Sequence, residues 1–385
     1  MITIQNADAA LKDYYLEAFT AQLNDDISPF FSAIEKNTDN VYGKDVKLAV
    51  VRGDAGGIVA GSEDGDLPGP HKNRYLNITA PLKNIYGTIE ISDKAMRASR
   101  ESVGAFVNLV NAEMEGLVAS ARENFARMLF GDGTAKLCKI TQKISAYEYR
   151  VDYVKPYFVG IQVDVYKNNN LVSNGYGLEI TGIDMVENSI KLNKDLGENW
   201  QNSAVYVHDS KDNEITGLDA LFSKSDLYGV SKTDEPYLIP QTFDSEGLSL
   251  SALCNVIDYM EENYNSKINL ILCSYKTRKK IASLDEVNRR VINTIDSHTG
   301  YGNVTINNIP VYADKHCPEG KIYFLNTDDF ALYQLCDWEW LEDEDGKILK
   351  QVPGKAAYTA TLVKYAELVC RKPCGQAIFT DFTID

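Results

Sequence analysis

One apolar stripe on a single long helix limits the fold of this chain more than any other feature. Between residues 103 and 129 the apolar side chains recur at spacings of three and four, which is the period of an α-helix. They are Val103, Phe106, Val107, Val110, Met114, Leu117, Val118, Ala121, Phe125, Met128 and Leu129. The spacing predicts a helix from Ser102, as N-cap, to Phe130, ended by Gly131 and about 43 Å long. Such a helix needs a second layer along its whole apolar side.

The segment before this helix is unusually long and rich in glycine. Residues 43–83 contain seven glycines and three prolines, so they cannot form one regular element, and they are too long for an ordinary connection. Val46, Leu48 and Val50 on one side and residues 75–79 on the other alternate as strands do. We interpret the segment as a long β-hairpin that becomes ordered against another molecule. A solvated hairpin or a disordered linker remains the alternative.

The central part of that segment carries separate acidic and basic blocks. Glu63, Asp64 and Asp66 are followed closely by His71, Lys72 and Arg74. One copy of this surface could therefore complement another copy.

Composition excludes several classes of function. With 385 residues, of which 44% are hydrophobic, the chain can bury two or three cores. No apolar run approaches the length of a membrane span, and we expect no membrane association. The net charge of −16 argues against a surface that grips nucleic acid. The odd number of scattered cysteines, seven, predicts reduced and mostly buried thiols.

The motifs of common enzymes are absent from the sequence. There is no GxGxxG between strand and helix, no GxxxxGK[ST], no HExxH and no GxSxG. The pair His316-Cys317 and the spacing of Cys370 and Cys374 could suggest a nucleophile or a metal, but neither has the partners that such sites need. We therefore assign no catalytic, cofactor-binding or metal-binding residue. The basic run at residues 276–280 is interpreted as a solvated helix face.

The rest of the chain divides into pieces of different character. Residues 8–35 have near-helical apolar spacing interrupted by Pro29 and predict an amphipathic N-terminal arm in two segments. Residues 134–216 are tyrosine-rich and strand-like and predict a self-contained β module. From residue 248 helices and strands alternate as in a small α/β lobe. The tail is predicted to be antiparallel, with a hairpin at residues 371–376 that returns through the last strand.

In this order the pieces resemble the major capsid proteins of tailed phages. The resemblance covers nearly the whole chain, and its most specific parts are GDGT after the helix, ITGLDALF, and INNIPVYADKHCPEGKIYFLN. It implies an α+β fold with an N-terminal arm, an extended β-hairpin loop, a long spine helix, peripheral and axial domains, and an inserted β domain. The expected domains are the arm at 1–42, the loop at 43–82, the peripheral domain with the spine at 83–133, the inserted domain at 134–216, the peripheral domain again at 217–247, the axial domain at 248–310 and the C-terminal β part of the peripheral domain at 311–385.

The resemblance implies a structural protein rather than an enzyme. Its expected function is to assemble as hexamers and pentamers into an icosahedral shell around double-stranded DNA, without reading the DNA sequence. The expected partners are other copies, a portal and, since the chain starts almost directly at the arm, a separate scaffolding protein. A processed form of a longer chain is the alternative to separate scaffolding. The expected location is the virion capsid, after assembly in the host bacterial cytoplasm. The alternatives are an encapsulin-type compartment and an intracellular enzyme with a β accessory domain.

Candidates for contact between subunits lie in the arm and in the loop. They are Tyr15, Phe19, Phe30, Phe31, Asp54, Glu63, Asp64, Asp66, His71, Lys72 and Arg74.

Overall fold

The computed structural model describes residues 28–52, 58, 60–63, 73–94, 103–198, 200–244, 247–288, 304–343 and 346–382. These residues belong to two compact units. Unit 1 contains residues 83–220 and 337–364, and unit 2 contains residues 28–82, 221–336 and 365–385. The chain changes from one unit to the other inside two long strands, between Cys336 and Asp337 and between Lys364 and Tyr365.

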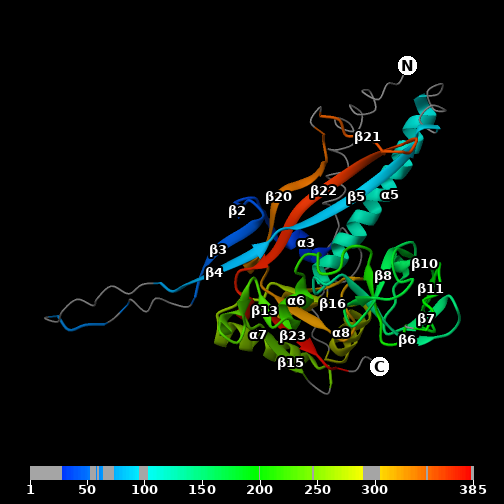
Figure 1. Ribbon diagram of the computed structural model, residues 1–385. Helices are drawn as coiled ribbons and strands as arrows, with labels where there is room; N and C mark the ends of the chain where they lie inside the picture. Colours follow the sequence, from blue (N-terminus) through cyan, green and yellow to red (C-terminus); the bar gives the residue numbers. More distant parts are fainter. Residues whose placement is uncertain are drawn as a thin grey trace. The chain divides into compact units, whose positions relative to one another are not determined.

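The long helix of unit 1 is present as predicted. It is α5 (Val103–Phe130), and it lies along strand β5 (Lys83–Ser92), which pairs with β22 (Ala357–Cys370) (Figure 1). Helix and strand approach closely at Gly87, where an added Cβ would lie 2.7 Å from a methyl carbon of Leu117. In the part of α5 whose side chains are described, the stripe residues Met114, Val118, Phe125 and Leu129 are buried. The apolar stripe therefore does face a second layer. The predicted N-cap, Ser102, lies outside the described residues.

A buried lysine holds the helix end to the sheet of unit 1. Lys364 of β22 has a fully buried side chain between the rings of Phe125 and Trp338, with its Nζ 5.8 and 5.6 Å from their centroids. The ammonium donates to Asp337 Oδ1 at 2.5 Å. The pair of charges and the two rings together make this burial tolerable. Asp337 and Trp338 belong to β20 (Phe330–Trp340), and β21 (Lys350–Gln351) extends the sheet beside β22.

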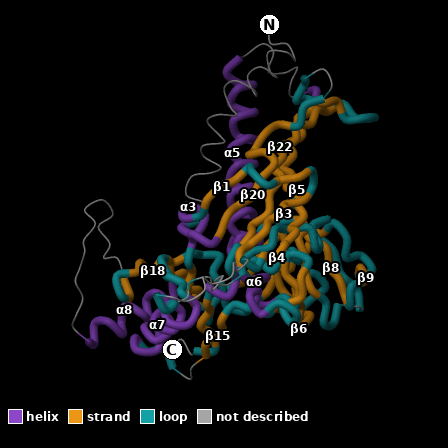
Figure 2. Tube along the Cα trace, turned by 90° about the vertical axis from the view of Figure 1, so that its left-hand side faces the viewer, coloured by secondary structure: helices purple, strands orange, loops and turns teal. Residues whose placement is uncertain are grey.

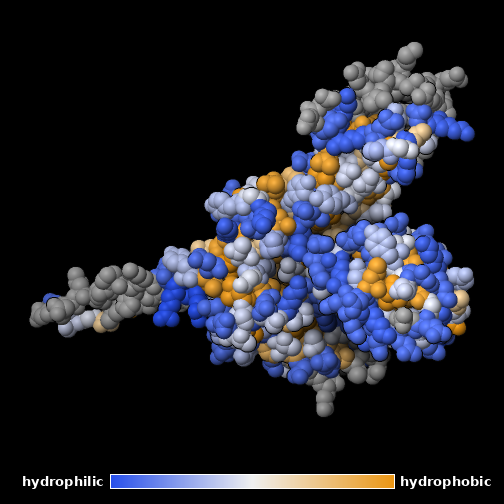
Figure 3. Space-filling view, viewed as in Figure 1, coloured by the Kyte–Doolittle hydropathy of each residue, from blue (hydrophilic) through white to orange (hydrophobic). Residues whose placement is uncertain are grey.

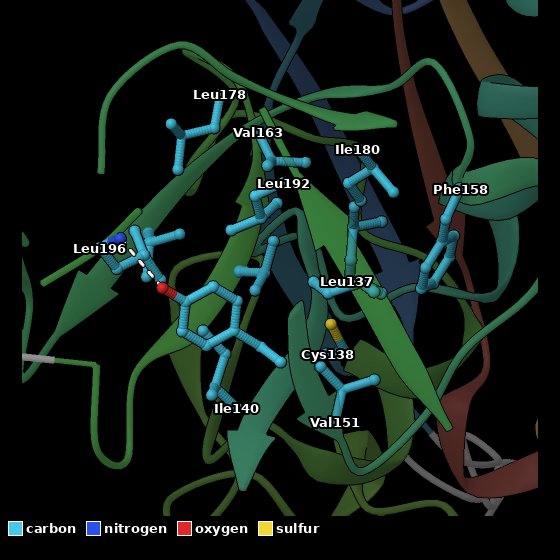
Figure 4. Close-up of a cluster of buried hydrophobic side chains, with 14 of the residues drawn as sticks. Leu137, Cys138, Ile140, Val151, Phe158, Val163, Leu178, Ile180, Leu192 and Leu196 are labelled. Atoms are coloured by element: carbon cyan, nitrogen blue, oxygen red, sulfur yellow. Dashed lines mark hydrogen bonds between the residues drawn. The ribbon is translucent and has the colours of Figure 1, made fainter. Parts of the chain in front are cut away.

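The predicted β module forms a closed antiparallel barrel with its own core. Its sheet has the order β10-β11-β7-β6-β12-β8-β9, and β10 also pairs with β8, which closes the ring. The strands are β6 (Lys136–Lys143), β7 (Glu148–Val151), β8 (Gln162–Lys167), β9 (Asn170–Leu171), β10 (Leu178–Asp184), β11 (Ser189–Leu192) and β12 (Ala204–Val207), with a 3₁₀ turn η3 (Pro156–Phe158). Every residue of the barrel core comes from this stretch, as Figure 4 shows for part of it.

Tyr149 is the largest side chain in that core, and its hydroxyl is fully satisfied. It donates to Asp195 Oδ1 at 2.8 Å and accepts from the amide of Leu196 at 3.0 Å. Asp195 also accepts from Lys143 at 2.6 Å, and these bonds lower the pKa of Asp195 to about 2.

In the face that Figure 3 shows, hydrophilic residues cover most of the barrel around a smaller apolar group.

The core of unit 2 is a six-stranded sheet in the order β15-β23-β19-β16-β18-β17. Its strands are β15 (Gln241–Asp244), β16 (Leu270–Cys273), β17 (Thr305–Ile306), β18 (Ile309–Ala313), β19 (Ile322–Leu325) and β23 (Ala377–Thr380). Helices α7 (Leu250–Tyr264) and α8 (Tyr275–Asn288) pack on it. The shorter elements of this unit are β13 (Asp226–Leu227), β14 (Val230–Ser231) and the 3₁₀ turns η4 (Pro236–Leu238), η5 (Thr327–Asp329) and η6 (Pro373–Gly375), while α6 (Leu218–Ser223) spans the boundary at residue 220.

Two sequence predictions about this region are wrong. The predicted domain boundary at residue 310 falls inside β18, whose neighbours β16 and β17 lie in the preceding segment. The predicted hairpin at residues 371–376 does not pair β22 with β23. Instead β23 pairs with β15 and β19, because η6 redirects the chain into the other sheet.

The first elements of unit 2 correct the predicted arm. Pro29 starts helix α3 (Pro29–Ala33) rather than interrupting one, since Ser28 caps it by accepting from the amide of Phe31. Strand β1 (Glu35–Asn37) then pairs in parallel with β20. Residues 28–37 are therefore part of the folded body, and residues 1–27 lie outside the described part. Within the described residues, no helix combines the length and the apolarity that a membrane crossing requires.

Candidate intersubunit surface and the elements that hold it

The predicted β-hairpin is present, with the predicted strands in register. Strands β2 (Val41–Tyr42), β3 (Asp45–Val51) and β4 (Tyr75–Pro81) form a three-stranded antiparallel sheet in unit 2. Val46 lies opposite Ala80, Leu48 opposite Ile78 and Val50 opposite Leu76. These pairs place the apolar residues of both strands on one face.

Within the described residues, this apolar face is covered only at its base. Val46, Ile78 and Ala80 are 1–2% exposed, whereas Leu48, Val50 and Leu76 further along are half-buried. On the opposite face, Val51 and Tyr75 at the far end are 48% and 60% exposed, and Ile58 beyond them is fully exposed. An apolar strand pair that loses its cover along its length needs another surface to complete it.

Polar contacts within unit 2 hold the hairpin both at its base and at the far end of its strands. The amide of Thr79 donates to the carbonyl of Tyr228 at 3.2 Å, and Arg52 Nη1 lies 2.9 Å from Glu235 Oε2. Tyr228 is itself fixed, because its buried hydroxyl accepts from the amide of Cys370 at 2.8 Å. Burial raises the pKa of this hydroxyl well above its ordinary value, so it stays protonated. The hairpin therefore leaves the body from a rigid base.

The structure places only some of the predicted contact residues. Glu63 and Arg74 are exposed, and the Arg74 carbonyl accepts from the amide of Arg52 at 2.7 Å. The others in the arm and loop lie outside the described residues, namely Tyr15, Phe19, Asp54, Asp64, Asp66, His71 and Lys72.

Phe30 and Phe31 are wrongly assigned as contact residues. They are 0% and 2% exposed, and the ring of Phe30 meets that of Phe330 edge-on at 5.2 Å. Their spacing marked an apolar helix face, but a sequence pattern does not show whether the surface that covers such a face belongs to the same chain.

Two of the sequence motifs meet at the end of α5. The GDGT turn is closed by Asp132, whose Oδ1 accepts from the amide of Thr134 at 2.9 Å. Gly217 of ITGLDALF packs against the last helical carbonyls, so that an added Cβ would lie 2.3 Å from the Met128 oxygen. Beside it, the buried Arg127 and Glu214 form a two-pronged ion pair, with Nη1 and Oε2 3.0 Å apart.

A histidine and two aspartates that the sequence did not bring together meet at the edge of the barrel. The buried Asp164 accepts from the amides of Gly177 and Asp209 and lies 2.8 Å from His208 Nδ1. On the other side of the imidazole, Nε2 lies 3.4 Å from Asp209 Oδ2. Their ligand atoms lie within 4.8 Å of one another, yet the two ring nitrogens face different carboxylates. This arrangement suits a hydrogen-bonded brace between β8 and the end of β12 better than a metal centre.

The seven cysteines all lie in the described part of the chain, and no disulfide joins them there. Five of them are buried, as the sequence predicts for most of the thiols. Burial raises the pKa of Cys273 to about 12, so this thiol is protonated and unreactive at neutral pH.

Comparison with known proteins gives matches of structure only. No protein-family model matches the sequence. No curated protein matches it either. Among solved structures, the capsid asymmetric unit of cyanophage A-1(L) matches 92% of this chain and 93% of its own at 14% identity and a TM-score of 0.54. The capsid of a native GTA particle matches 94% of this chain and 91% of its own at 9% identity and a TM-score of 0.51. An encapsulin complex from Synechococcus elongatus matches 93% of this chain and 89% of its own, at 10% identity and a TM-score of 0.46.

The two capsid matches with TM-scores above 0.5 extend over more than nine-tenths of this chain, so they include both units and the β module. The chain has the fold of the tailed-phage major capsid proteins.

Proposed function

We propose that this chain is a major capsid protein, which assembles as hexamers and pentamers into an icosahedral shell around double-stranded phage DNA. The observation that carries the proposal is the β3–β4 hairpin, which has a rigid base and an apolar face that its own chain covers only in part. A subunit of a closed shell needs extended contacts of this kind with its neighbours. The fold that the chain shares with capsid structures supports the same role.

The parts of the chain have distinct roles in this proposal. The helix α5 and strand β5 form the spine of a peripheral domain, and the hairpin laps a neighbouring subunit. The lobe that contains α7 and α8 is the axial domain near the centre of each capsomer, and the barrel at residues 136–207 is an inserted domain. The partners are other copies, a portal and a separate scaffolding protein. Assembly takes place in the host bacterial cytoplasm, and the mature location is the virion.

Electron microscopy and sizing of the purified, full-length chain test the proposal. Expressed with its scaffolding partner where one is required, the chain is expected to form closed megadalton shells. A chain that remains monomeric or dimeric at high concentration would contradict the shell role and favour the enzyme alternative. Shells that enclose a protein cargo in place of DNA, when isolated from the natural source, would favour the encapsulin alternative.

A further inference from the structure

The two helices on the sheet of unit 2 carry opposite charges on their exposed faces. Helix α7 buries Leu253, Val256, Ile257 and Met260 against the sheet, and Ser249 caps it. Its exposed face carries Asp258, Glu261 and Glu262. We call these three residues the acidic face.

Helix α8 presents the opposite charge. Thr277 and Ile281 are buried, while Lys276 and Lys279 are exposed and Arg278 and Lys280 are half-buried. The Arg278 guanidinium lies 5.5 Å from the ring centroid of Tyr275, which is itself 59% exposed. We call the two exposed lysines, Lys276 and Lys279, which lie three residues apart on one side of the helix, the basic face. It concentrates positive charge on a chain whose net charge is −16.

Both helices lie on the same face of the six-stranded sheet. They share one core cluster, in which Leu253 and Val256 of α7 and Ile281 of α8 meet Ile271 and Cys273 of β16. The helices also contact each other (Figure 2). The crossovers from β15 to β16 and from β16 to β18 run in the same direction across the sheet, so right-handed connections place α7 and α8 side by side. The acidic face and the basic face thus lie next to each other on one surface of unit 2.

Within the described part of the chain, these charges are scarcely compensated. Lys276 pairs with Glu319 at 3.8 Å, but both side chains are more than half exposed. No described ion pair joins Asp258, Glu261, Glu262 or Lys279 to an opposite charge. Lys267, shortly after α7, is exposed, and Lys372 Nζ donates to the carbonyls of Tyr264 and Asn265 at the end of this helix, at 2.8 and 3.1 Å.

We propose that the acidic face of one copy docks on the basic face of the next copy around the ring of a capsomer. The inference rests on the proposed function and names the partner of this lobe as a second copy of the chain. Because different surfaces meet, the contact is head-to-tail, and head-to-tail contacts generate rings when the rotation closes. Exposed charges of this kind fix orientation and exclude wrong neighbours more than they add affinity.

Charge reversal tests this contact in full-length subunits. Lys276→Glu with Lys279→Glu makes both faces acidic, and Glu261→Lys with Glu262→Lys makes both basic. Each double variant is expected to lower the yield of particles roughly tenfold or more, because like charges then face each other. Combining all four substitutions restores opposite charges and is expected to return the yield to near the wild-type value. Lys267→Glu, a single charge reversal outside the basic face, is the control and leaves assembly unchanged.

Mixing the two double variants gives a sharper result. In an even-membered ring the two can alternate, so that every contact joins opposite charges. A five-membered ring cannot alternate completely and keeps one like-charged contact. The mixture is therefore expected to restore hexamers in preference to pentamers, which native mass spectrometry of capsomers resolves.

The outcomes separate this inference from the proposed function. Normal particle yields from both double variants overturn the head-to-tail contact and leave the shell role intact, whereas absence of shells from the wild-type chain overturns the shell role. Failure of the fourfold variant to recover also overturns the inference, provided that its subunits keep the wild-type circular dichroism spectrum. If a reversal variant does not fold, the single variants Lys279→Gln and Glu262→Gln take its place. They are expected to lower the particle yield as well, but by less. Unchanged yields from both would then overturn the contact.

Discussion

At the scale of single residues, Gly217 shows how closely the end of α5 is packed. An added Cβ at this position would lie 2.3, 2.6 and 2.7 Å from the backbone oxygens of Met128, Gly131 and Leu129. Backbone atoms at a helix end cannot move aside as a flexible side chain can. This position therefore requires glycine because of space, whatever its backbone dihedrals.

We expect Gly217→Ala to lower the free energy of unfolding by about 1–3 kcal/mol or more, because the clash forces the helix end to shift. Differential scanning calorimetry of unassembled subunits measures the change. Gly116→Ala is the matched control, since an added Cβ at that exposed helical position meets nothing within 4 Å. That substitution should raise the stability by about 1 kcal/mol through helix propensity. Equal stability of Gly217→Ala and the wild type would show that the packing at the helix end is loose.

At the residue scale, the sequence shows which side chains are apolar but not which residues they contact. The sequence predicts that Phe30 and Phe31 contact another subunit, but both are buried within unit 2, and the partner of Phe30 is Phe330, three hundred residues further along the chain. The Asp164–His208–Asp209 brace was missed for the same reason. Its members lie 44 residues apart and meet only because β8 pairs with β12.

At the scale of elements, the β3–β4 hairpin is the part whose removal should separate folding from assembly. Its base is fixed by the bond from Thr79 to Tyr228, and the far end of its strands by the Arg52–Glu235 pair, all within unit 2. Deleting residues 53–69 and joining the arms by a short turn should leave these contacts in place. The prediction is a soluble subunit with a wild-type circular dichroism spectrum that fails to close shells. Negative-stain microscopy counts the closed shells, and assembly at the wild-type level would refute the role of the hairpin.

A scrambled segment of equal length at residues 53–69 is the control for that deletion. It keeps the spacing of the arms and the net charge but changes the positions of the acidic residues Asp54, Glu63, Asp64 and Asp66. Loss of assembly in both variants would indicate that the order of charges matters as well as the length of the loop.

Elements were predicted well where one periodicity extended over many residues. Helix α5 ends at Phe130 as predicted, and β3 and β4 have the predicted partners. The local sequence pattern could not predict that β23 joins the six-stranded sheet of unit 2 rather than the sheet that contains β22. A strand of alternating apolar residues after a turn fits a hairpin with the strand before it, and only the tertiary pairing with β15 and β19 decides otherwise.

At the scale of the whole molecule, the net charge of the chain determines how an assembled shell interacts with the DNA that we propose it encloses. With a net charge of −16, subunits and DNA repel each other at distances up to about 8 Å at physiological salt. Binding to DNA through released counterions needs clusters of Lys and Arg. The basic face of α8 is such a cluster, but in the proposed shell it is covered by the next copy.

We therefore predict that assembled shells do not retain DNA once they are opened at physiological salt. Sedimentation of opened particles, followed by measurement of DNA in the pellet and in the supernatant, tests this. A variant with a lysine-rich C-terminal extension provides the control that should retain DNA. Retention by the wild-type shell that disappears at high salt would contradict the prediction.

The barrel of residues 136–207 has its first and last strands as neighbours. Strand β6 pairs with β12, with Lys136 opposite Tyr206, so the chain enters and leaves the module at adjacent points. No barrel strand needs a partner outside the module, because β8 and β10 close the ring. The module is thus joined to the rest of the chain through the adjacent ends of β6 and β12. Replacing it by another domain with similarly spaced ends, such as a reporter or an antigen, should leave α5 and its sheet unchanged, which makes this the natural position for carrying a foreign domain on every subunit.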